Sequence, residues 1–314
     1  MPAIVYLLAG YVGMSLGQIS GRQLFVIANT WNDFPRENVI DVDAMPAQAL
    51  QAYLVLKDRG FTDSQIELML YHPNNTLIDV DGDGANDLIA AMIDSEDYLV
   101  TKETLGASID ELLKGAGKND EVTIYIVAHG ELVGGSVGFS FESGYTVTSK
   151  EFEGWLTNST CKCLNIFLDF CYSGSFARSL VKAGRLIIYA AEDNKEGWFY
   201  WNWRDDLNET DRATFGNSGS AFFHPFWKKF SEGSTVYEAL QYGKEQCLRW
   251  GSIDSNSSSM TQVQNPGIYA QQRSFWEDFM FYYPGGSDIF VVSTILLAIV
   301  ESIIIAIVLS GRRR

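Results

Sequence analysis

The sequence predicts an α/β protein, a three-layer α/β/α sandwich built on a mainly parallel sheet, followed by one C-terminal transmembrane helix. Near-continuous apolar runs rich in β-branched residues alternate with segments that carry apolar residues at helical spacing. This alternation is typical of βαβ units, in which helices cover both faces of a parallel sheet. The chain then ends in a mostly apolar segment, 289–309, which is long enough to span a bilayer.

Five apolar runs are short, continuous and bounded by polar or glycine residues, which favours buried strands. The predicted strands are 24–28, 66–71, 122–128, 164–170 and 186–191. Other segments have apolar residues on one helical face and stop before Gly or polar turns. The predicted helices are 46–58, 108–113, 150–156, 177–182, 221–230 and 236–250. Strands and helices in this order predict one doubly covered sheet.

Composition narrows the class of function. The 314 residues carry a formal net charge of −16, which argues against a nucleic-acid partner because phosphate binding needs clustered Lys and Arg. Four cysteines are too few for a disulfide scaffold, and the pair Cys161 and Cys163 lacks a second pair at zinc-site spacing. We expect no organic cofactor.

The apolar segment 289–309 carries one charge, Glu301. As a helix rising about 1.5 Å per residue it is roughly 31 Å long, enough to cross the hydrocarbon core. The basic tail 310–314 follows it, so the positive-inside rule places this tail in the cytoplasm and the preceding chain outside a cell membrane or in the lumen of an endomembrane. Because a carboxylate is costly in lipid, Glu301 is predicted to be protonated or to face a partner subunit.

The first 19 residues are predicted to be a signal peptide or another N-terminal apolar segment. Residues 3–16 are apolar and uncharged, and Ser15 and Gly17 provide small residues at signal-peptidase spacing. An uncleaved anchor and a first buried strand are the open alternatives. Four Asn-x-Ser/Thr sequons, which fit an exported surface, begin at Asn74, Asn158, Asn208 and Asn256. The folded domain is therefore expected over 20–284.

A Cys/His pair follows two of the predicted strands. The third strand runs into His129 and Gly130, and the fourth runs into Cys171. Reactive groups of an α/β sheet collect where parallel strands end, so the two side chains are expected to meet if these strands are neighbours. A nucleophilic cysteine needs such a base close by. The N–H of Gly130 is a candidate to stabilise an oxyanion.

These residues carry a resemblance to a family. Residues 125–130 (YIVAHG) resemble the strand–His-Gly motif of legumain-like, caspase-fold cysteine peptidases, and residues 168–175 (LDFCYSGS) resemble their acidic-x-Cys-x-Ser-Gly motif. Supporting segments extend the resemblance over 24–270. It implies a caspase-like sheet and a cysteine-type endopeptidase that cleaves peptide or protein substrates through a thioester.

Residue by residue, the resemblance implies that Cys171 is the nucleophile, His129 the general base and acid, and Gly130 the oxyanion donor. Asp169 stands where the family carries an acidic residue at the floor of the specificity pocket. Legumain pairs that residue with an arginine, but here Ala44 occupies the aligned position and Arg36 is out of register. The resemblance therefore leaves open cleavage after Arg or Lys and cleavage after Asn.

Two asparagines just past the first strand, Asn29 and Asn32, are candidates for orienting His129. The polar, aromatic-rich segment 195–214 is a candidate cleavage or gating loop.

An acidic segment lies between the second and third strands. Asp79, Asp81, Asp83 and Asp87 occupy relative positions 1, 3, 5 and 9, with a glycine at position 6. Clustered carboxylate oxygens with a glycine at the sharp turn are typical of calcium loops. We therefore expect a structural Ca²⁺ at this segment, the alternative being a solvated acidic turn.

Two other functions stay open. The layout of a luminal legumain-like domain and a C-terminal membrane helix is similar to the catalytic subunit of GPI transamidase, which would transfer the acyl group to an amine. The other alternative is a calcium-dependent surface binding module whose catalytic residues are vestigial.

Overall fold

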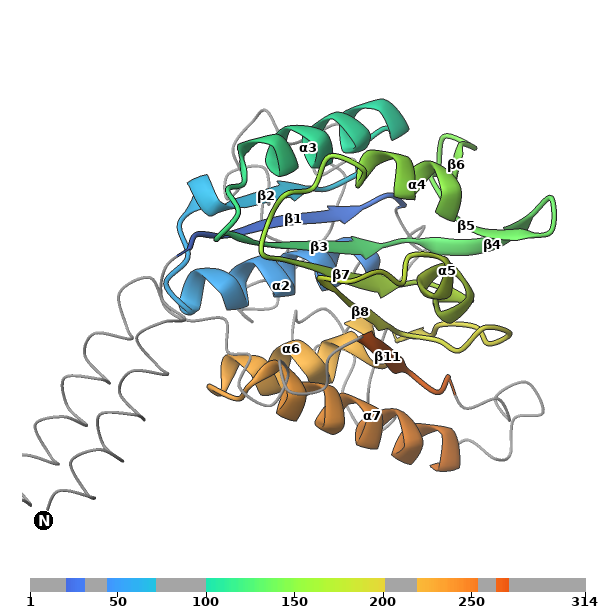
Figure 1. Cartoon of the computed structure of the whole chain (residues 1–314). Coiled ribbons are helices and arrows are strands. Elements are labelled where there is room, and N and C mark those ends of the chain that lie inside the picture. Colours follow the sequence, from blue (N-terminus) through green and yellow to red (C-terminus); the bar gives the residue numbers. More distant parts are fainter. Residues whose placement is uncertain (1–20, 32–43, 72–99, 201–218, 254–263, 271–314) are drawn as a thin grey trace, which may run out of the picture.

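A computed structural model describes residues 21–31, 44–71, 100–200, 219–253 and 264–270. Its core is a six-stranded sheet with the strand order β11-β8-β7-β3-β1-β2 (Figure 1). The strands are β1 (Gln23–Asn29), β2 (Ile66–Met69), β3 (Glu121–Val127), β7 (Cys163–Asp169), β8 (Arg185–Tyr189) and β11 (Gly267–Ala270). Five strands are parallel, and β11 pairs antiparallel with β8 at one edge.

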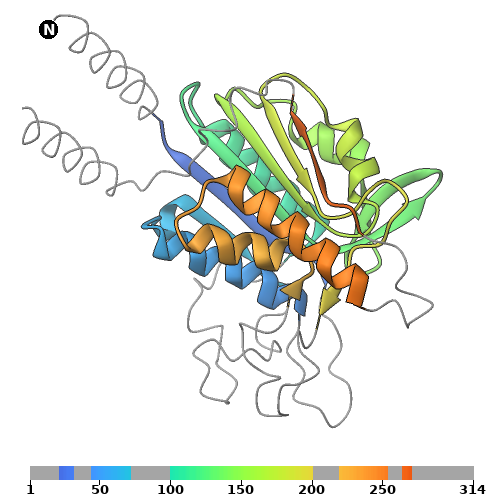
Figure 2. The ribbon, with the colours of Figure 1, turned by 90° about the horizontal axis from the view of Figure 1, so that it is seen from below.

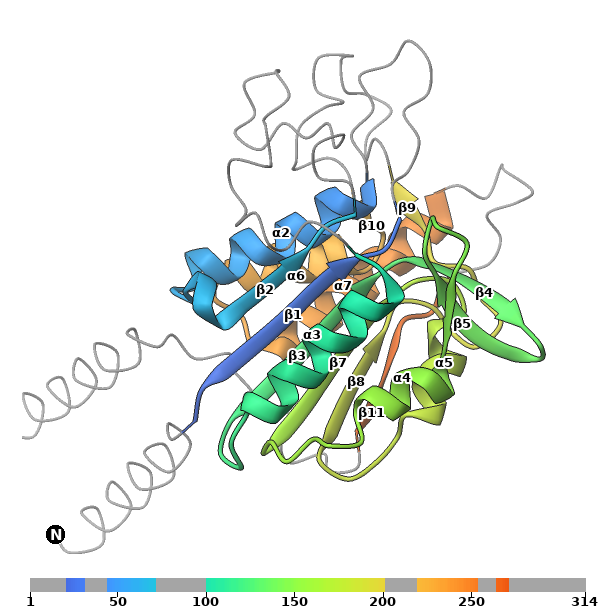
Figure 3. The same cartoon turned by 90° about the horizontal axis from the view of Figure 1, so that it is seen from above.

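Helices cover both faces of this sheet. Figure 2 shows α2 (Ala44–Asp58), α6 (Phe223–Ser231) and α7 (Val236–Ile253) on one face. Figure 3 shows α3 (Lys102–Gly115), α4 (Ser149–Trp155) and α5 (Ser173–Ser179) on the other face. A separate apolar cluster fills each helix–sheet layer. The three-layer α/β/α sandwich with a mainly parallel sheet is therefore confirmed for the described residues.

The strand sequences explain these two clusters. The side chains of β3 alternate between them, with Tyr125 and Val127 in the first and Ile124 and Ile126 in the second. Successive side chains of a strand point to opposite faces, so a strand buried on both faces is apolar at most positions. This requirement produces the near-continuous apolar runs of the sequence.

Several short strands lie outside the six-stranded sheet. A three-stranded antiparallel sheet consists of β4 (His129–Val133), β5 (Ser136–Ser140) and β6 (Thr146–Thr148), in that order. The β4–β5 connection is the two-residue turn Gly134-Gly135, with φ of 58° and 83°, values that glycine adopts without steric cost. The two-stranded β9 (Phe199–Tyr200) and β10 (Gly219–Ser220), and the 3-10 turn η1 (Asp63–Gln65), complete the described elements.

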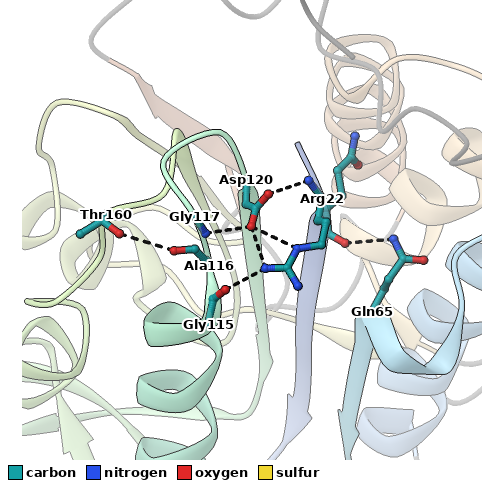
Figure 4. A network of polar contacts seen from close by, with 8 residues as sticks. Arg22, Gln65, Gly115, Ala116, Gly117, Asp120 and Thr160 are labelled. Carbon is teal, nitrogen blue, oxygen red and sulfur yellow. Dashed lines mark hydrogen bonds and ion pairs between the residues drawn. The ribbon is translucent and has the colours of Figure 1, made fainter. Parts of the chain in front are cut away.

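An ion pair between the buried carboxylate of Asp120 and the largely exposed guanidinium of Arg22 fixes the amino end of the sheet (Figure 4). The Asp120 carboxylate accepts hydrogen bonds from the backbone N–H of Arg22 at 2.7 Å, from its guanidinium at 3.0 and 3.2 Å, and from the N–H of Gly117 at 2.8 Å. Arg22 also donates to the carbonyl of Gly115 at 2.7 Å. Burial alone would raise the pKa of Asp120, but these donors bring that pKa below its usual value. We call these residues the Arg22–Asp120 clamp.

The five predicted strands are confirmed, with end shifts of one or two residues. The helix predicted at 108–113 is too short, because α3 begins at Lys102 behind a Thr101 cap that accepts from the N–H of Thr104. The prediction of helix 177–182 is also displaced, because α5 begins at Ser173. Strands β4–β6, β9–β10 and β11 were not predicted.

Within the described ranges, no helix has the length and hydrophobicity to cross a bilayer. The predicted signal or apolar segment 1–19, the membrane segment 289–309 with Glu301, and the tail 310–314 all lie outside those ranges.

Candidate active site

The strand register brings the Cys/His pair together. β3 and β7 are parallel neighbours, and Val127 is the register partner of Asp169. The N–H of Ala128 donates to the carbonyl of Asp169 at 3.2 Å, which extends the pairing by one residue. His129 and Cys171 each stand two residues past the last paired position, so the carboxyl edge of the sheet presents both. The expected adjacency of the two strands is confirmed.

The backbone of Gly130 lies against the backbone of Cys171. A Cβ atom added to Gly130 would lie 1.9 Å from the Cys171 carbonyl oxygen, far inside van der Waals contact, so only glycine allows this approach. The Gly130 N–H faces the Cys171 sulfur closely enough to counteract the rise of the thiol pKa. The Gly130 N–H therefore lies near the Cys171 sulfur.

The turn after β7 places the half-buried Cys171 two residues before the start of α5. Tyr172 adopts a left-handed conformation with φ of 63°, and α5 begins at the next residue. The fully buried Ser173 holds this turn to β8, because its hydroxyl accepts from the N–H of Ala191 at 3.0 Å. A non-glycine residue at positive φ is uncommon. The sharp reversal lets the sulfur leave the sheet instead of entering the core.

A second loop packs over the sulfur. The Gly197 N–H donates to the Cys171 Sγ at 3.3 Å, and the thiol faces the Gly197 carbonyl oxygen at 3.6 Å. The N–H of Tyr172 donates to the Lys195 carbonyl at 2.8 Å, which fixes the same loop. A Cβ on Gly197 would lie 3.1 Å from the Phe170 carbonyl carbon, so this position also favours glycine. The start of the candidate gating loop 195–214 therefore contacts Cys171 directly.

Aromatic packing positions His129. The ring of Trp31 meets the imidazole edge-to-face, with centroids 4.9 Å apart. The loop that carries Trp31 is held by Asn29, whose amide donates to the Trp31 carbonyl at 2.7 Å and whose oxygen accepts from the N–H of Tyr71 at 2.9 Å. Asn29 thus supports the residue that packs on His129. The other predicted asparagine, Asn32, lies outside the described residues.

Both members of the pair favour their uncharged forms at neutral pH. Burial lowers the pKa of His129, although the charge of Glu131 opposes that change. Burial also raises the pKa of the Cys171 thiol, against hydrogen bonds from the N–H groups of Gly197 and Gly130. Desolvation disfavours the charged form of any group. At neutral pH, Cys171 therefore rests as a thiol and His129 as a neutral imidazole.

Asp169 lies beneath the site and is 1% exposed. Its carboxylate oxygens accept hydrogen bonds from the hydroxyl of Tyr125 at 2.8 Å and from that of Ser220 at 2.7 Å. Burial raises the pKa of Asp169 to about 7, although both hydrogen bonds oppose that rise. The predicted specificity residue is thus a buried carboxyl group that joins β7 to β3 and β10.

The remaining predicted residues lie in α2 or outside the described residues. Ala44, aligned with the arginine of legumain, is the buried first residue of α2, and Arg36 lies outside the described residues. The predicted calcium ligands Asp79, Asp81, Asp83 and Asp87 also lie outside them. In the described part of the chain, no three His, Cys, Asp or Glu side chains gather closely enough to hold a metal ion.

The sequence analysis missed three residues that shape the site. Trp31 contacts His129, Gly197 contacts Cys171, and Ser220 donates a hydrogen bond to Asp169. Gly197 lies 26 residues beyond Cys171, and no local pattern links the two. Trp31 lies two residues past the end of β1, and that position is the one signal that could have pointed to it.

The α/β/α sandwich carries Cys171 and His129 just past the ends of two adjacent parallel strands, as the resemblance to caspase-fold cysteine peptidases implied. The family model of the peptidase C13 family matches residues 44–241, more than half of the chain. The protein therefore belongs to the peptidase C13 family, the legumain family of cysteine peptidases. The family match and the fold thus agree with the resemblance.

Two solved structures are similar to this chain. Caspase-1 from Spodoptera frugiperda has a TM-score of 0.45 and 13% identity, over 80% of this chain and 86% of that one. A protein from Geobacter sulfurreducens has a TM-score of 0.48 and 12% identity, over 83% of this chain and 99% of that one. Among curated proteins, no sequence matches.

Proposed function

We propose that the protein is a cysteine endopeptidase that cleaves peptide bonds with Cys171 as nucleophile and His129 as general base. The observation that carries this proposal is the register of β3 and β7, which sets both residues at the same edge of the sheet. The close approach of Gly130 to Cys171 adds an N–H donor beside the sulfur.

The uncharged resting pair suits a proton transfer coupled to attack. As the Cys171 sulfur attacks the carbonyl carbon, the thiol proton passes to the imidazole of His129, and the oxyanion faces the Gly130 N–H. His129 then gives this proton to the departing amine, which leaves a thioester on Cys171. Water attacks the thioester after losing a proton to His129, and the released thiol recovers that proton.

We propose that Asp169 sets a preference for Arg or Lys before the scissile bond. Its carboxyl group lies two residues before Cys171 and is held by hydroxyl groups only. A substrate cation that replaced the Ser220 hydroxyl would shift the pKa of Asp169 downward by its charge. A purely structural Asp169 would leave the residue preference unchanged in Asp169→Asn.

We also propose that segment 289–309 anchors the protein in a membrane, with the catalytic domain outside or luminal and partner subunits at Glu301. A structural Ca²⁺ is proposed at Asp79, Asp81, Asp83 and Asp87. These parts are supported by the sequence patterns alone. Membrane fractionation tests the first, and peptide cleavage with calcium against a chelator tests the second.

The central experiment is cleavage of a peptide library by the full chain and by Cys171→Ala. We expect the substitution to reduce cleavage by more than about 10³-fold, because it removes the nucleophile. Cys161→Ala is the matched control, since Cys161 precedes β7 at the opposite end of that strand. Equal cleavage by the wild type and Cys171→Ala would falsify the proposal. Acyl transfer to an added amine without hydrolysis would favour a transamidase.

A further inference from the structure

One fully buried threonine connects three strands near the candidate active site. Thr30 follows β1 directly, and all of its polar groups are hydrogen-bonded. Its N–H donates to the carbonyl of Val127 at 3.1 Å, and its hydroxyl donates to the carbonyl of Ser140 at 2.6 Å. Its own carbonyl accepts from the N–H of Glu142 at 3.1 Å. The end of β1 is therefore tied to the ends of β3 and β5.

These contacts lie close to His129. Val127 is the last residue of β3 and precedes His129 by two positions. Ser140 is the register partner of His129 in the β4–β5 pair. The Thr30 hydroxyl therefore binds the residue directly opposite His129.

The neighbour of Thr30 packs on the imidazole itself. Trp31 follows Thr30 in the chain, and its ring meets the His129 ring at a centroid distance of 4.9 Å and an interplanar angle of 88°. Thr30 thus fixes the backbone next to the ring that contacts His129 on one side. Through Ser140 it also fixes the strand that pairs with the backbone of His129.

The position of Thr30 matters because His129 belongs to a separate small sheet. Strands β4, β5 and β6 form their own three-stranded sheet, outside the six-stranded one. One link between the two sheets is the chain itself, which passes from β3 through Ala128 into β4. Thr30 provides a second link, from the end of β1 to β5. Two links at different strands restrain the angle between the sheets, which a single link would leave free.

The hydroxyl is the part of this link that a side-chain substitution can remove. The Ser140 carbonyl lies in a residue that is 7% exposed, where bulk water does not replace a lost donor. Buried carbonyl groups are nearly always hydrogen-bonded, so β5 must move if the Thr30 hydroxyl is absent. Since β5 pairs with β4, His129 would move with it.

We propose that Thr30 is a positioning residue of the active site, whose hydroxyl holds the three-stranded sheet against the end of β1 and so sets the place of the His129 imidazole. This role rests on the function proposed above, in which His129 takes the thiol proton of Cys171. Proton transfer depends steeply on the geometry of the two groups, so a small displacement lowers the rate of the chemical step.

The first test compares two substitutions of Thr30 in the full chain. Thr30→Val keeps the shape of the side chain and removes the hydroxyl, and we expect kcat to fall about tenfold with KM changed less than about twofold. Thr30→Ser keeps the hydroxyl and removes the methyl group, so kcat should stay within about threefold of the wild type. Full kcat in Thr30→Val, or an equal loss in Thr30→Ser, overturns the proposal.

Thr123→Val is the matched control. Thr123 is 3% exposed and lies on β3, four residues before the end of that strand, and its hydroxyl accepts from the side-chain amide of Asn165 at 3.2 Å. The substitution removes the same buried hydroxyl group away from His129, and kcat should remain that of the wild type. Equal losses of kcat in Thr30→Val and Thr123→Val would mean that a general loss of packing, and not the position of His129, explains the effect.

A second readout follows the imidazole directly and needs no turnover. The Trp31 ring current shifts the NMR resonances of the His129 ring protons, which are assigned in the full chain with isotopically labelled histidine and the variant His129→Gln. We expect these resonances to move in Thr30→Val and to stay in place in Thr30→Ser and Thr123→Val. Unchanged resonances in Thr30→Val overturn the proposal.

The NMR measurement also separates this proposal from the proposed function. If the wild type cleaves no peptide, the endopeptidase activity is wrong, and the resonances alone decide the role of Thr30. A shift that is confined to Thr30→Val then supports the placement of His129 by Thr30, and no shift overturns it.

Discussion

The two ends of the sheet bury a carboxyl group in opposite ways. At the amino end, Asp120 meets the Arg22 guanidinium and two backbone N–H groups, which hold its pKa below the usual value. At the carboxyl end, Asp169 meets only the hydroxyls of Tyr125 and Ser220, and burial raises its pKa to about 7. At the amino end, the charge of Asp120 is paired with that of Arg22. At the carboxyl end, burial shifts the pKa values of Asp169, His129 and Cys171 toward their uncharged forms. Such perturbed groups concentrate at functional sites.

The sharpest test of this contrast is the pH dependence of Asp169→Asn. A carboxyl group with a raised pKa binds its proton more tightly in the folded state, so it costs stability as the pH rises from the unfolded pKa, near 4, to about 7. A rise from 3.8 to about 7 corresponds to about 4 kcal/mol. The free energy of unfolding of the wild type, relative to Asp169→Asn, should fall by that order between pH 4 and pH 8 in urea titrations. A constant difference would mean that Asp169 ionises normally.

We expect Gly130→Ala to disturb the site around Cys171 without changing the Arg22–Asp120 clamp. Its Cβ would lie 1.9 Å from the Cys171 carbonyl oxygen, so β4 and the Cys171 turn must separate. We expect a loss of about 10²-fold in kcat/KM, the usual cost of a displaced oxyanion donor. Gly154→Ala is the control, because an added Cβ there meets nothing within 4 Å. Normal activity of Gly130→Ala would exclude an oxyanion role for that N–H.

We expect Asp120→Asn to weaken the Arg22–Asp120 clamp without changing peptide cleavage. Loss of a buried charge that accepts from Arg22 and Gly117 is expected to cost about 2 kcal/mol of unfolding free energy at pH 7. Because the folded-state pKa of Asp120 is lowered, its stabilisation is present above the unfolded pKa and is lost as the pH falls through the folded pKa. The variant and the wild type should therefore converge in thermal unfolding toward pH 3. Divergence on acidification would contradict the ion-pair interpretation.

The smallest effect is expected from Glu131→Gln. The charge of Glu131 opposes the fall in the His129 pKa that burial causes, so its removal lowers that pKa further. The acid limb of the kcat/KM profile, below which His129 is protonated, should move to lower pH, with less than about a threefold change at the plateau. Movement of the limb to higher pH would show that His129 is not the titrating group.

The central architecture was predictable because the parallel strands are buried on both faces. β3 and β7 are apolar at nearly every position, and the motif residues follow them directly. The start of α3 was missed because its capping residues Thr101 and Thr104 are polar. The turn Gly134-Gly135 indicates a hairpin in the sequence, yet nothing local shows that the edge of β4 faces Cys171.

The electrostatic setting of the site was not predictable for a different reason. The partners of Asp169 are Tyr125 and Ser220, which lie 44 and 51 residues away along the chain. A sequence pattern identifies an acidic residue, but the ionisation of that residue depends on which side chains the sheet brings to it. Tertiary packing alone determines that an arginine pairs with Asp120 and that hydroxyl groups bind Asp169.

The Arg22–Asp120 clamp also marks an end of the molecule that is suited to immobilisation. Arg22 fixes the start of β1 at the edge opposite Cys171, and a strand of seven residues separates the two edges by roughly 23 Å. A biotin attached to a residue before Gly21 would hold the protein on a sensor surface by the amino end of the sheet, whereas a side chain at Gly21 itself would overlap the Asn119 carbonyl oxygen. Every immobilised copy would then present Cys171 and the hairpin tip to the flowing solution.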